Sequence, residues 1–354
     1  MGFFDWASSG EEFDMTLHRT PSEMIEISVV VPTYNRANLI GETLNSILRQ
    51  SKKPNEIIVI DDGSKDNTEQ VVRDFGLGVK YIKIENSGEC RARNVGVSLA
   101  MSEFVAFCDS DDLWHPDKLM LQSRIFAAVP ECEYSFTNFK IVTNDLWSSD
   151  TKFDSLPPTF FSLPKIDVDT DCFVVKPGIF DRLLRNQPIF PSSVMMKRSF
   201  FESVGKWDES IGRIPSVDLE FHLRCVGRGN IGVVAAPVVG IRKHASNFSG
   251  DPYKLSVGEV AILRYVLSTN PMAKHFASLI NEQITTRNSN AAELAFAEGH
   301  FEEARKLLTD IRPENRSWKL QLKSLILSCP AWLRRRLWQY SLFMGEKLRT
   351  HVSR

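Results

Sequence analysis

The first half of the chain alternates short apolar runs with amphipathic segments. Continuous apolar runs predict four buried strands, at 27–31, 56–60, 79–84 and 103–108. Apolar residues at helical spacing predict the helices between them, at 40–50, 66–75 and 91–100. Strands that are apolar throughout and alternate with helices are typical of a parallel sheet covered on both faces. The pattern therefore predicts an α/β fold with a mostly parallel sheet.

The second half is less regular. Between 145 and 191 the pattern breaks down into proline, aspartate and aromatic residues, and we expect a lid or substrate-binding loop there. On either side of this segment, the spacing of the apolar residues predicts helices at 116–129, 198–204 and 216–224. It also predicts strands at 133–138, 192–196 and 231–239. From about 255 the chain is rich in helices, and 291–308 resembles one tetratricopeptide-type helical pair, which cannot bury its own faces alone. We expect an N-terminal extension over 1–25, a main domain over 26–250 and a helical appendage over 251–354.

Composition narrows the class of protein. The net charge of −1 gives no support for a nucleic-acid partner. The six cysteines form no C-x-x-C pair, which favours reduced thiols in a cytoplasmic protein over a disulfide or zinc framework. No run reaches the ~18 apolar residues of a membrane span, and the acidic N-terminus does not resemble a signal peptide.

Three carboxylates, Asp109, Asp111 and Asp112, directly follow the fourth predicted strand. Carboxylates this close repel one another, and a hard divalent cation such as Mg²⁺ or Mn²⁺ is a simple reason to hold them together. The alternative is a solvated acidic turn in which Asp112 caps the next helix. Further polar clusters follow the first and second strands, at 32–36 and 61–64. Ligands of open α/β sheets bind at the carboxyl ends of the strands, so these clusters are expected to converge on one site.

Six motifs in this order resemble those of the family-2 glycosyltransferases, which are inverting enzymes of the GT-A fold. They are Val-Val-Val31-Pro-Thr-Tyr-Asn35-Arg, Val59-Ile-Asp61-Asp62-Gly-Ser64-x-Asp66-x-Thr68, Asn86-x-Gly88 with Ala92-Arg93-Asn94-x-Gly96, Asp109-Ser-Asp111-Asp112, Asp218-x-Glu220-x-x-x-Arg224 and Arg242-x-His244-x-x-Asn247-x-Ser249. The resemblance covers 27–250. It divides the main domain into a nucleotide-binding half, 26–140, and an acceptor half, 141–250.

The resemblance implies a nucleotide-sugar donor, with UDP favoured. Tyr34 and Pro32 would stack on the base, and Asp62 would accept a base N–H. The remaining donor-binding residues implied are Arg36, Arg93, Asp109 and Ser110. Taken alone, Tyr34 could equally be a half-buried core residue, Asp62 could form a turn with Gly63, and Arg93 could lie on the surface.

The resemblance also implies a metal site and a catalytic base. Asp111 would bind Mn²⁺ or Mg²⁺ directly, Asp109 would contact the ribose or the ion through water, and His244 would add a ligand or bond the diphosphate. Asp218 aligns with the family's base, although Val217 stands where the family usually has Glu. Glu220 therefore remains an alternative base, and a helix-surface acid paired with Arg224 remains an alternative role for Asp218.

We therefore expect a metal-assisted inverting glycosyltransferase that acts on a glycan or lipid-linked glycan acceptor. The rival functions are a sugar nucleotidyltransferase, which should carry a Gly-rich signature with Lys after the first strand, and a non-catalytic nucleotide-binding scaffold. In the basic tail, 316–354, aromatic residues interleave with Arg334, Arg335 and Arg336. This composition suits a helix at the cytoplasmic face of an anionic membrane, or aromatics that pack inward beneath a solvated basic face.

Overall fold

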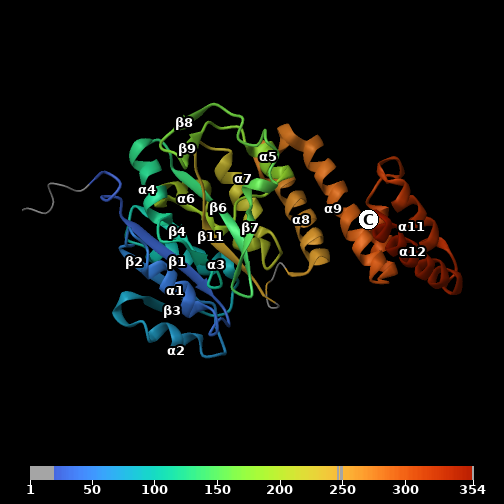
Figure 1. Cartoon of the computed structure of the whole chain (residues 1–354), viewed down its shortest axis with the longest axis horizontal. Coiled ribbons are helices and arrows are strands. Elements are labelled where there is room, and N and C mark those ends of the chain that lie inside the picture. Colours follow the sequence, from blue (N-terminus) through green and yellow to red (C-terminus); the bar gives the residue numbers. More distant parts are fainter. Residues whose placement is uncertain (1–19, 245–246, 248–249, 353–354) are drawn as a thin grey trace, which may run out of the picture.

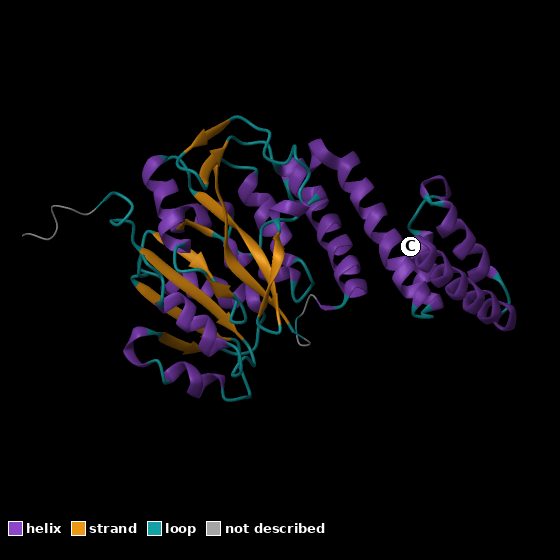
Figure 2. Ribbon diagram, in the orientation of Figure 1, coloured by secondary structure: helices purple, strands orange, loops and turns teal. Residues whose placement is uncertain are grey.

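The computed structural model describes residues 20–244, 247 and 250–352, with side chains as far as Ser341 (Figures 1 and 2). Most of the N-terminal extension, residues 1–19, lies outside the described residues. A mixed sheet of eleven strands runs through the described main domain, in the order β3-β2-β1-β4-β10-β6-β11-β9-β8, with β5 and β7 pairing with β11 and β6.

The first part of the main domain, as far as β4, contains the predicted parallel strands and helices. Its four neighbouring parallel strands are β1 (Ile27–Thr33), β2 (Glu56–Asp61), β3 (Lys80–Lys83) and β4 (Phe104–Phe107). The connecting helices are α1 (Ile40–Leu48), α2 (Thr68–Arg73) and α3 (Glu89–Leu99). Each of these strands and helices lies within three residues of its predicted bounds, and the apolar runs of β1, β2 and β4 are buried. The prediction of an α/β fold is confirmed.

Beyond β4 the same sheet continues with strands of both directions. The strands are β5 (Leu113–Trp114), β6 (Tyr134–Thr143), β7 (Leu146–Thr151), β8 (Lys165–Asp167), β9 (Cys172–Val175), β10 (Met195–Lys197) and β11 (Ile231–Lys243). The helices are α4 (Lys118–Ala128), α5 (Phe180–Arg185), α6 (Arg198–Val204) and α7 (Val217–Val226). Because β10 runs antiparallel between β4 and β6, it joins the four parallel strands to the rest of the sheet.

The segment 145–191 is not the irregular loop that its composition predicts. It contains β7, β8, β9 and α5, and β9 pairs antiparallel with β11 inside the main sheet. The buried side chains of β9 are Cys172, Val174 and Val175. Strands of three to six residues, two of them with exposed side chains, leave too little periodicity to be recognised in the sequence.

Helices cover both faces of the sheet and enclose a hydrophobic core on each side. Close packing fixes α3 on one face: a Cβ added at Gly96 would lie 2.3 Å from Val30 Cγ1. Only glycine allows this approach, which brings the N-terminal turn of α3 to the carboxyl ends of β1 and β4. That turn carries Glu89 and Arg93.

The C-terminal helices extend away from the sheet (Figure 1). They are α8 (Pro252–Thr269), α9 (Ala277–Ala297), α10 (Phe301–Thr309), α11 (Trp318–Ser328) and α12 (Ala331–Val352). Helix α8 and the start of α9 pack into the main core through Leu263 and Ile280, whereas a separate core from Ala292 to Leu327 holds the later helices together. No helix among the described residues is long and apolar enough to cross a membrane.

Candidate active site

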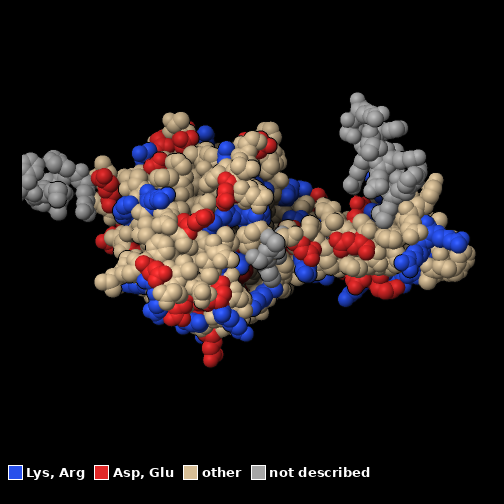
Figure 3. Space-filling model, turned by 60° about the horizontal axis from the view of Figure 1, so that its bottom comes forward, with Lys and Arg blue, Asp and Glu red and all other residues tan. Residues whose placement is uncertain are grey.

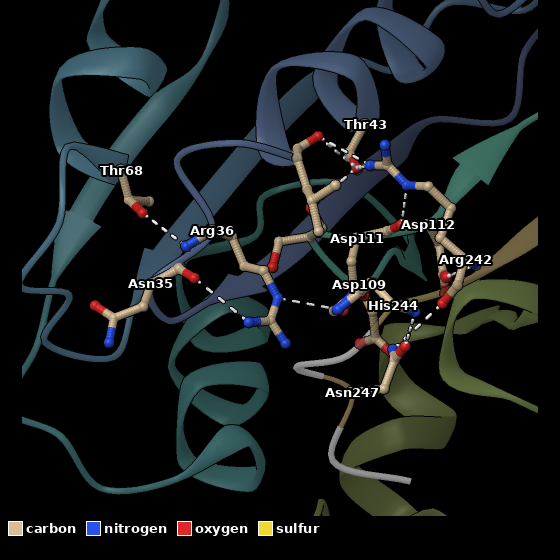
Figure 4. A network of polar contacts seen from close by, with 12 residues as sticks. Asn35, Arg36, Thr43, Thr68, Asp109, Asp111, Asp112, Arg242, His244 and Asn247 are labelled. Carbon is tan, nitrogen blue, oxygen red and sulfur yellow. Dashed lines mark hydrogen bonds and ion pairs between the residues drawn. The ribbon is translucent and has the colours of Figure 1, made fainter. Parts of the chain in front are cut away.

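Asp111 is the meeting point of three loops at the carboxyl ends of the strands (Figure 4). Its Oδ2 lies 3.2 Å from Nε of Arg36, on the loop after β1, and 3.0 Å from Nε2 of His244, just after β11. Desolvation raises the pKa of Asp111, but the hydrogen bond with His244 and the charge of Arg36 outweigh it, so the pKa lies below its usual value. The carboxylate is therefore ionised at neutral pH.

Asp112 and Arg242 hold this acidic loop in place. The buried carboxylate of Asp112 accepts hydrogen bonds from Ser192 Oγ (2.5 Å) and from the backbone N–H of Arg242 (3.1 Å). Burial, followed by the charges of Asp111 and Asp109, raises the pKa of Asp112 well above its usual value. The Arg242 guanidinium donates to the carbonyl oxygen of Asp111 and to Thr43 Oγ1. Asp112 and Arg242 thus have a positioning role for Asp111.

Asp109 is turned toward the buried Arg93. The Nη2 of Arg93 lies 2.8 Å from Asp109 Oδ1, and the guanidinium stacks over the Trp207 ring at 4.7 Å from its centroid. The coulombic attraction of Asp109, against desolvation, helps to keep the pKa of Arg93 above its usual value. Ser110 is 5% exposed, and its carbonyl oxygen accepts a hydrogen bond from Thr43.

Tyr34 is the exposed aromatic ring at the end of β1, with 38% of its surface accessible. Pro32 is buried within β1, opposite Ile60 of β2, and presents no face to solvent. After Tyr34 the chain turns through Asn35 in a left-handed conformation (φ 51°). The backbone N–H groups of Asn35 and Arg36 donate to Ser64 Oγ and Thr68 Oγ1, and Asn35 Oδ1 accepts from the backbone N–H of Lys65. These bonds hold the loop after β1 against the segment after β2.

Asp62 anchors the loop before α3. Its Oδ1 accepts from the backbone N–H of Ser87 (2.6 Å) and its Oδ2 from that of Gly88 (2.9 Å). The same Oδ2 lies 3.0 Å from Nη2 of Arg213, which comes from the loop before α7. A carboxylate has about four lone-pair positions, so Oδ1 retains capacity for one further donor.

Asp218 stands in the first turn of α7 and is partly buried. Its Oδ2 accepts a hydrogen bond from Gln187 Nε2 at 3.0 Å. Burial raises the pKa of Asp218 to about 7; the charge of Arg93 opposes this shift, while those of Glu89 and Asp109 add to it. These electrostatic neighbours belong to the predicted donor side of the site. Glu220 lies two residues further along α7, is 3% exposed and pairs with Arg224.

Glu220 and Arg224 face a different part of the molecule. They line a cavity of about 770 Å³ between α7, α8 and the loop after α6, together with Trp207, Tyr265 and Met272. None of the residues predicted to bind donor or metal lines this cavity. Two residues along a helix are about 200° apart, so the cavity and Asp218 lie on opposite sides of α7.

Three polar residues at the site were not among the sequence-predicted candidates. Glu89 opens α3, and burial raises its pKa, with Arg93 opposing and Asp109 adding. Arg213 bonds Asp62, and Gln187 bonds Asp218. Glu89 has a sequence signal, since it directly follows the Asn86-x-Gly88 motif. Arg213 and Gln187 have no such signal, because each bonds a residue far along the chain: Arg213 and Asp62 are 151 residues apart, and Gln187 and Asp218 are 31 residues apart.

Residues 28–147, which contain Tyr34, Asp62, Arg93 and Asp111, match the family model described as Glycosyl transferase family 2. The likeness to family 2 glycosyltransferases therefore covers about a third of the chain and includes the segments that carry these four residues. Curated relatives extend the likeness beyond the matched residues. A glycosyltransferase of Rickettsia felis, named as uncharacterized, is 27% identical over 259 residues, which are 72% of this chain and 39% of that protein.

A second relative, from Escherichia coli, is named UDP-Glc:alpha-D-GlcNAc-diphosphoundecaprenol beta-1,3-glucosyltransferase WfgD. It is 30% identical over 167 residues, which are 47% of this chain and 64% of that protein. The chain therefore spans less than two thirds of the length of either relative. The crystal structure of S. aureus TarS 1-349 in complex with UDP-GlcNAc matches with a TM-score of 0.60 at 19% identity, covering 91% of this chain and 92% of that chain. At this identity the likeness is one of fold: the main domain has the GT-A fold.

Proposed function

We propose that this chain is an inverting glycosyltransferase that transfers a sugar from a UDP-sugar to a glycan or lipid-linked glycan. The observation that carries the proposal is the convergence of Asp111, Arg36 and His244 at the strand ends, with Asp218 on the acceptor side. A rigid, partly buried cluster of this kind is suited to a charged leaving group and a proton acceptor.

The donor base would lie on the Tyr34 ring, with Asp62 as acceptor of its N–H. Tyr34 supplies the exposed ring, and Oδ1 of Asp62 has capacity for one further bond. The favoured base is uracil, which is the base in the UDP-GlcNAc complex of TarS and in the UDP-Glc of the WfgD name. Arg36 and Arg93, both basic and close to the acidic loop, would balance the charge of the diphosphate.

Asp111 and His244 would hold the divalent cation. Their ligating atoms lie 3.0 Å apart, a separation that two ligands of one metal ion can have. Among the described residues no group of three or more His, Cys, Asp or Glu is arranged to hold an ion. The remaining ligands would be diphosphate oxygens and water, as Mg²⁺ and Mn²⁺ commonly accept. Such an ion would stabilise negative charge on the departing nucleoside diphosphate.

Asp218 would act as the base. Its carboxylate would take the proton of the acceptor hydroxyl as that oxygen attacks the anomeric carbon and the bond to the diphosphate breaks, with inversion. A pKa of about 7 lies close to the working pH, where a general base combines an ionised form with useful basicity. Gln187, bonded to Oδ2, would orient the carboxylate.

We propose a lipid-linked acceptor because the WfgD name specifies a diphosphoundecaprenol substrate, and with it a peripheral contact with an anionic membrane. Helix α11 exposes Trp318, Leu322 and Leu325, whose spacing places them on one face. Basic residues gather at the outer end of the helical region (Figure 3), and 316–341 contains no acidic residue.

Of the aromatic residues in the basic tail, Trp332 and Tyr340 are exposed. Trp338 packs inward and donates to the carbonyl oxygen of Phe296, and the side chain of Phe343 lies outside the described residues.

The proposal is tested by incubating the full chain with a panel of UDP-sugars and either Mn²⁺ or Mg²⁺. We expect one UDP-sugar to raise the melting temperature only with metal, and slow release of UDP that accelerates when the correct acceptor glycan is added. Asp218→Asn is expected to keep the thermal shift and lose the release. A protein that responds to no UDP-sugar, but releases pyrophosphate from UTP and a sugar phosphate, would instead be a nucleotidyltransferase.

A further inference from the structure

The loop between α6 and α7, residues 205–216, lies against α3 and reaches Asp62 at the end of β2. It is attached to α3 at its start, where Asn94 Nδ2 donates to the carbonyl oxygen of Trp207 (2.9 Å) and to Glu209 Oε1 (2.8 Å). Arg91 adds an ion pair with Glu209 at 3.4 Å. The rest of the loop turns through left-handed conformations at Gly212 (φ 73°) and Ser216 (φ 67°) before α7 begins.

Arg213 is the residue through which this loop contacts the proposed base site. Its Nη2 lies 3.0 Å from Asp62 Oδ2 and also donates to Asn86 Oδ1. Its guanidinium carbon lies 5.8 Å from the centroid of the Tyr34 ring. One side chain therefore engages both groups assigned to the donor base, the ring that would stack on it and the carboxylate that would bond it.

The base and the guanidinium do not fit over Tyr34 together. Planar groups stack at about 3.5 Å, so a base sandwiched between Tyr34 and Arg213 needs about 7 Å between ring and guanidinium. The observed separation is 5.8 Å. The arginine side chain is 48% exposed, so it can leave toward solvent without disturbing the core.

We infer that Arg213 covers the Tyr34 ring when no donor is bound, and that a base stacking on this ring displaces the guanidinium and draws it away from Oδ2 of Asp62. This inference rests on the proposed donor site. Displacement releases the loop at the end that leads into α7, and Asp218 stands five residues after Arg213. Arg213 is thus a residue that sets donor affinity and couples donor binding to the loop before the base.

The test measures binding of uridine and UDP to the wild-type full chain, Arg213→Ala and Arg91→Ala. Uridine is the deciding probe, because it carries no phosphate charge for Arg213 to attract. An exposed ion pair and a cation–π contact are each modest, so Arg213→Ala should bind uridine roughly three- to tenfold more tightly. Arg91→Ala removes an α3 cation that pairs with the same loop but does not contact Tyr34 or Asp62, and its uridine affinity should equal that of the wild type.

Hydrogen exchange supplies the second measurement. Amides of 209–216 should exchange faster when UDP is added to the wild type, and should already exchange fast in Arg213→Ala without UDP. Uridine binding to the wild type with equal or weaker binding to Arg213→Ala would overturn the inference and leave the donor site intact. Absence of uridine and UDP binding in all three proteins would overturn the donor site and the inference with it.

Discussion

Glu220 and Arg224, one turn apart on α7, form a two-bond ion pair in which Nε lies 2.6 Å from Oε1 and Nη2 lies 2.7 Å from Oε2. The same guanidinium donates to the carbonyl oxygens of Val204 and Lys206. Glu220 is therefore committed to holding α7 against the loop after α6. It is Glu220, and not Asp218, that makes the pairing with Arg224 considered from the sequence.

This relationship predicts opposite phenotypes for two neighbouring substitutions. Asp218→Asn keeps the shape and removes the proton acceptor, so the transfer rate should fall ~10²–10⁴-fold with little change in UDP affinity. Glu220→Gln breaks a buried charge pair, so it should lower the melting temperature and leave the rate of the remaining folded protein near wild type. Transfer assays and thermal unfolding on both variants distinguish the roles. An inactive but stable Glu220→Gln protein would show that the base was misassigned.

The raised pKa of Asp218 predicts how both activity and stability depend on pH. The base must be ionised, so the transfer rate should rise as the pH increases through about 7. The folded-state pKa exceeds the unfolded value, so Asp218 costs no stability near pH 4 and becomes progressively more costly as the pH rises toward 7.

Asn carries no charge to desolvate. One pKa unit corresponds to ~1.4 kcal/mol, and we expect Asp218→Asn to raise the free energy of unfolding by roughly 1–3 kcal/mol at pH 8 and by much less at pH 5. Urea unfolding at the two pH values provides the measurement. A stabilisation of equal size at both pH values would point to packing and not to charge.

Asp111→Asn should abolish the metal-dependent part of UDP binding. The amide keeps the side-chain volume but loses the negative charge that a divalent cation needs. Thermal shift with UDP, with and without Mn²⁺, should show a metal-dependent increase for the wild type and none for the variant. The matched control is Asp117→Asn, an exposed acid six residues later, which should behave as wild type. Full retention of the shift in Asp111→Asn would contradict the metal assignment.

The exposed row on α11 predicts lipid-dependent flotation. The full chain should float with vesicles containing anionic phosphatidylglycerol and much less with pure phosphatidylcholine vesicles. Replacing Trp318 and Leu325 together by Ser should weaken flotation, because both side chains are about two-thirds exposed and carry the apolar contact. Leu77→Ser, which removes a fully exposed leucine from the nucleotide-binding half, serves as control. Equal flotation of the double variant and the wild type would exclude α11 from the contact.

The parts of the molecule that were predictable are those governed by local pattern. Strands β1, β2 and β4 each contain a run of buried apolar residues, so these runs could be recognised without knowledge of the strands' partners. The polar residues at their carboxyl ends meet because parallel strands share one edge, which is how Asp111 comes to lie beside Arg36.

The parts that escaped prediction depend on distant partners. β8 has three exposed residues and exists through its pairing with β9. Arg213 reaches Asp62 through a loop whose path no local signal encodes. The inward turn of Trp338 depends on the position of Phe296 and Phe301, which a pattern of aromatic and basic residues does not contain.

The position of β10 has a consequence for how the chain is made and cut. β4 is apolar and buried along its whole length, and its second neighbour, Met195–Lys197, follows almost ninety residues later. During synthesis β4 therefore remains an unpaired, apolar edge strand until β10 has been synthesised, and such edges tend to pair with other chains and aggregate. A fragment that ends at 147, where the family match ends, retains β4 and β6 but lacks both β10 and β11. The proposed donor-binding residues between 28 and 147 thus lie on a segment that needs later strands to complete its sheet.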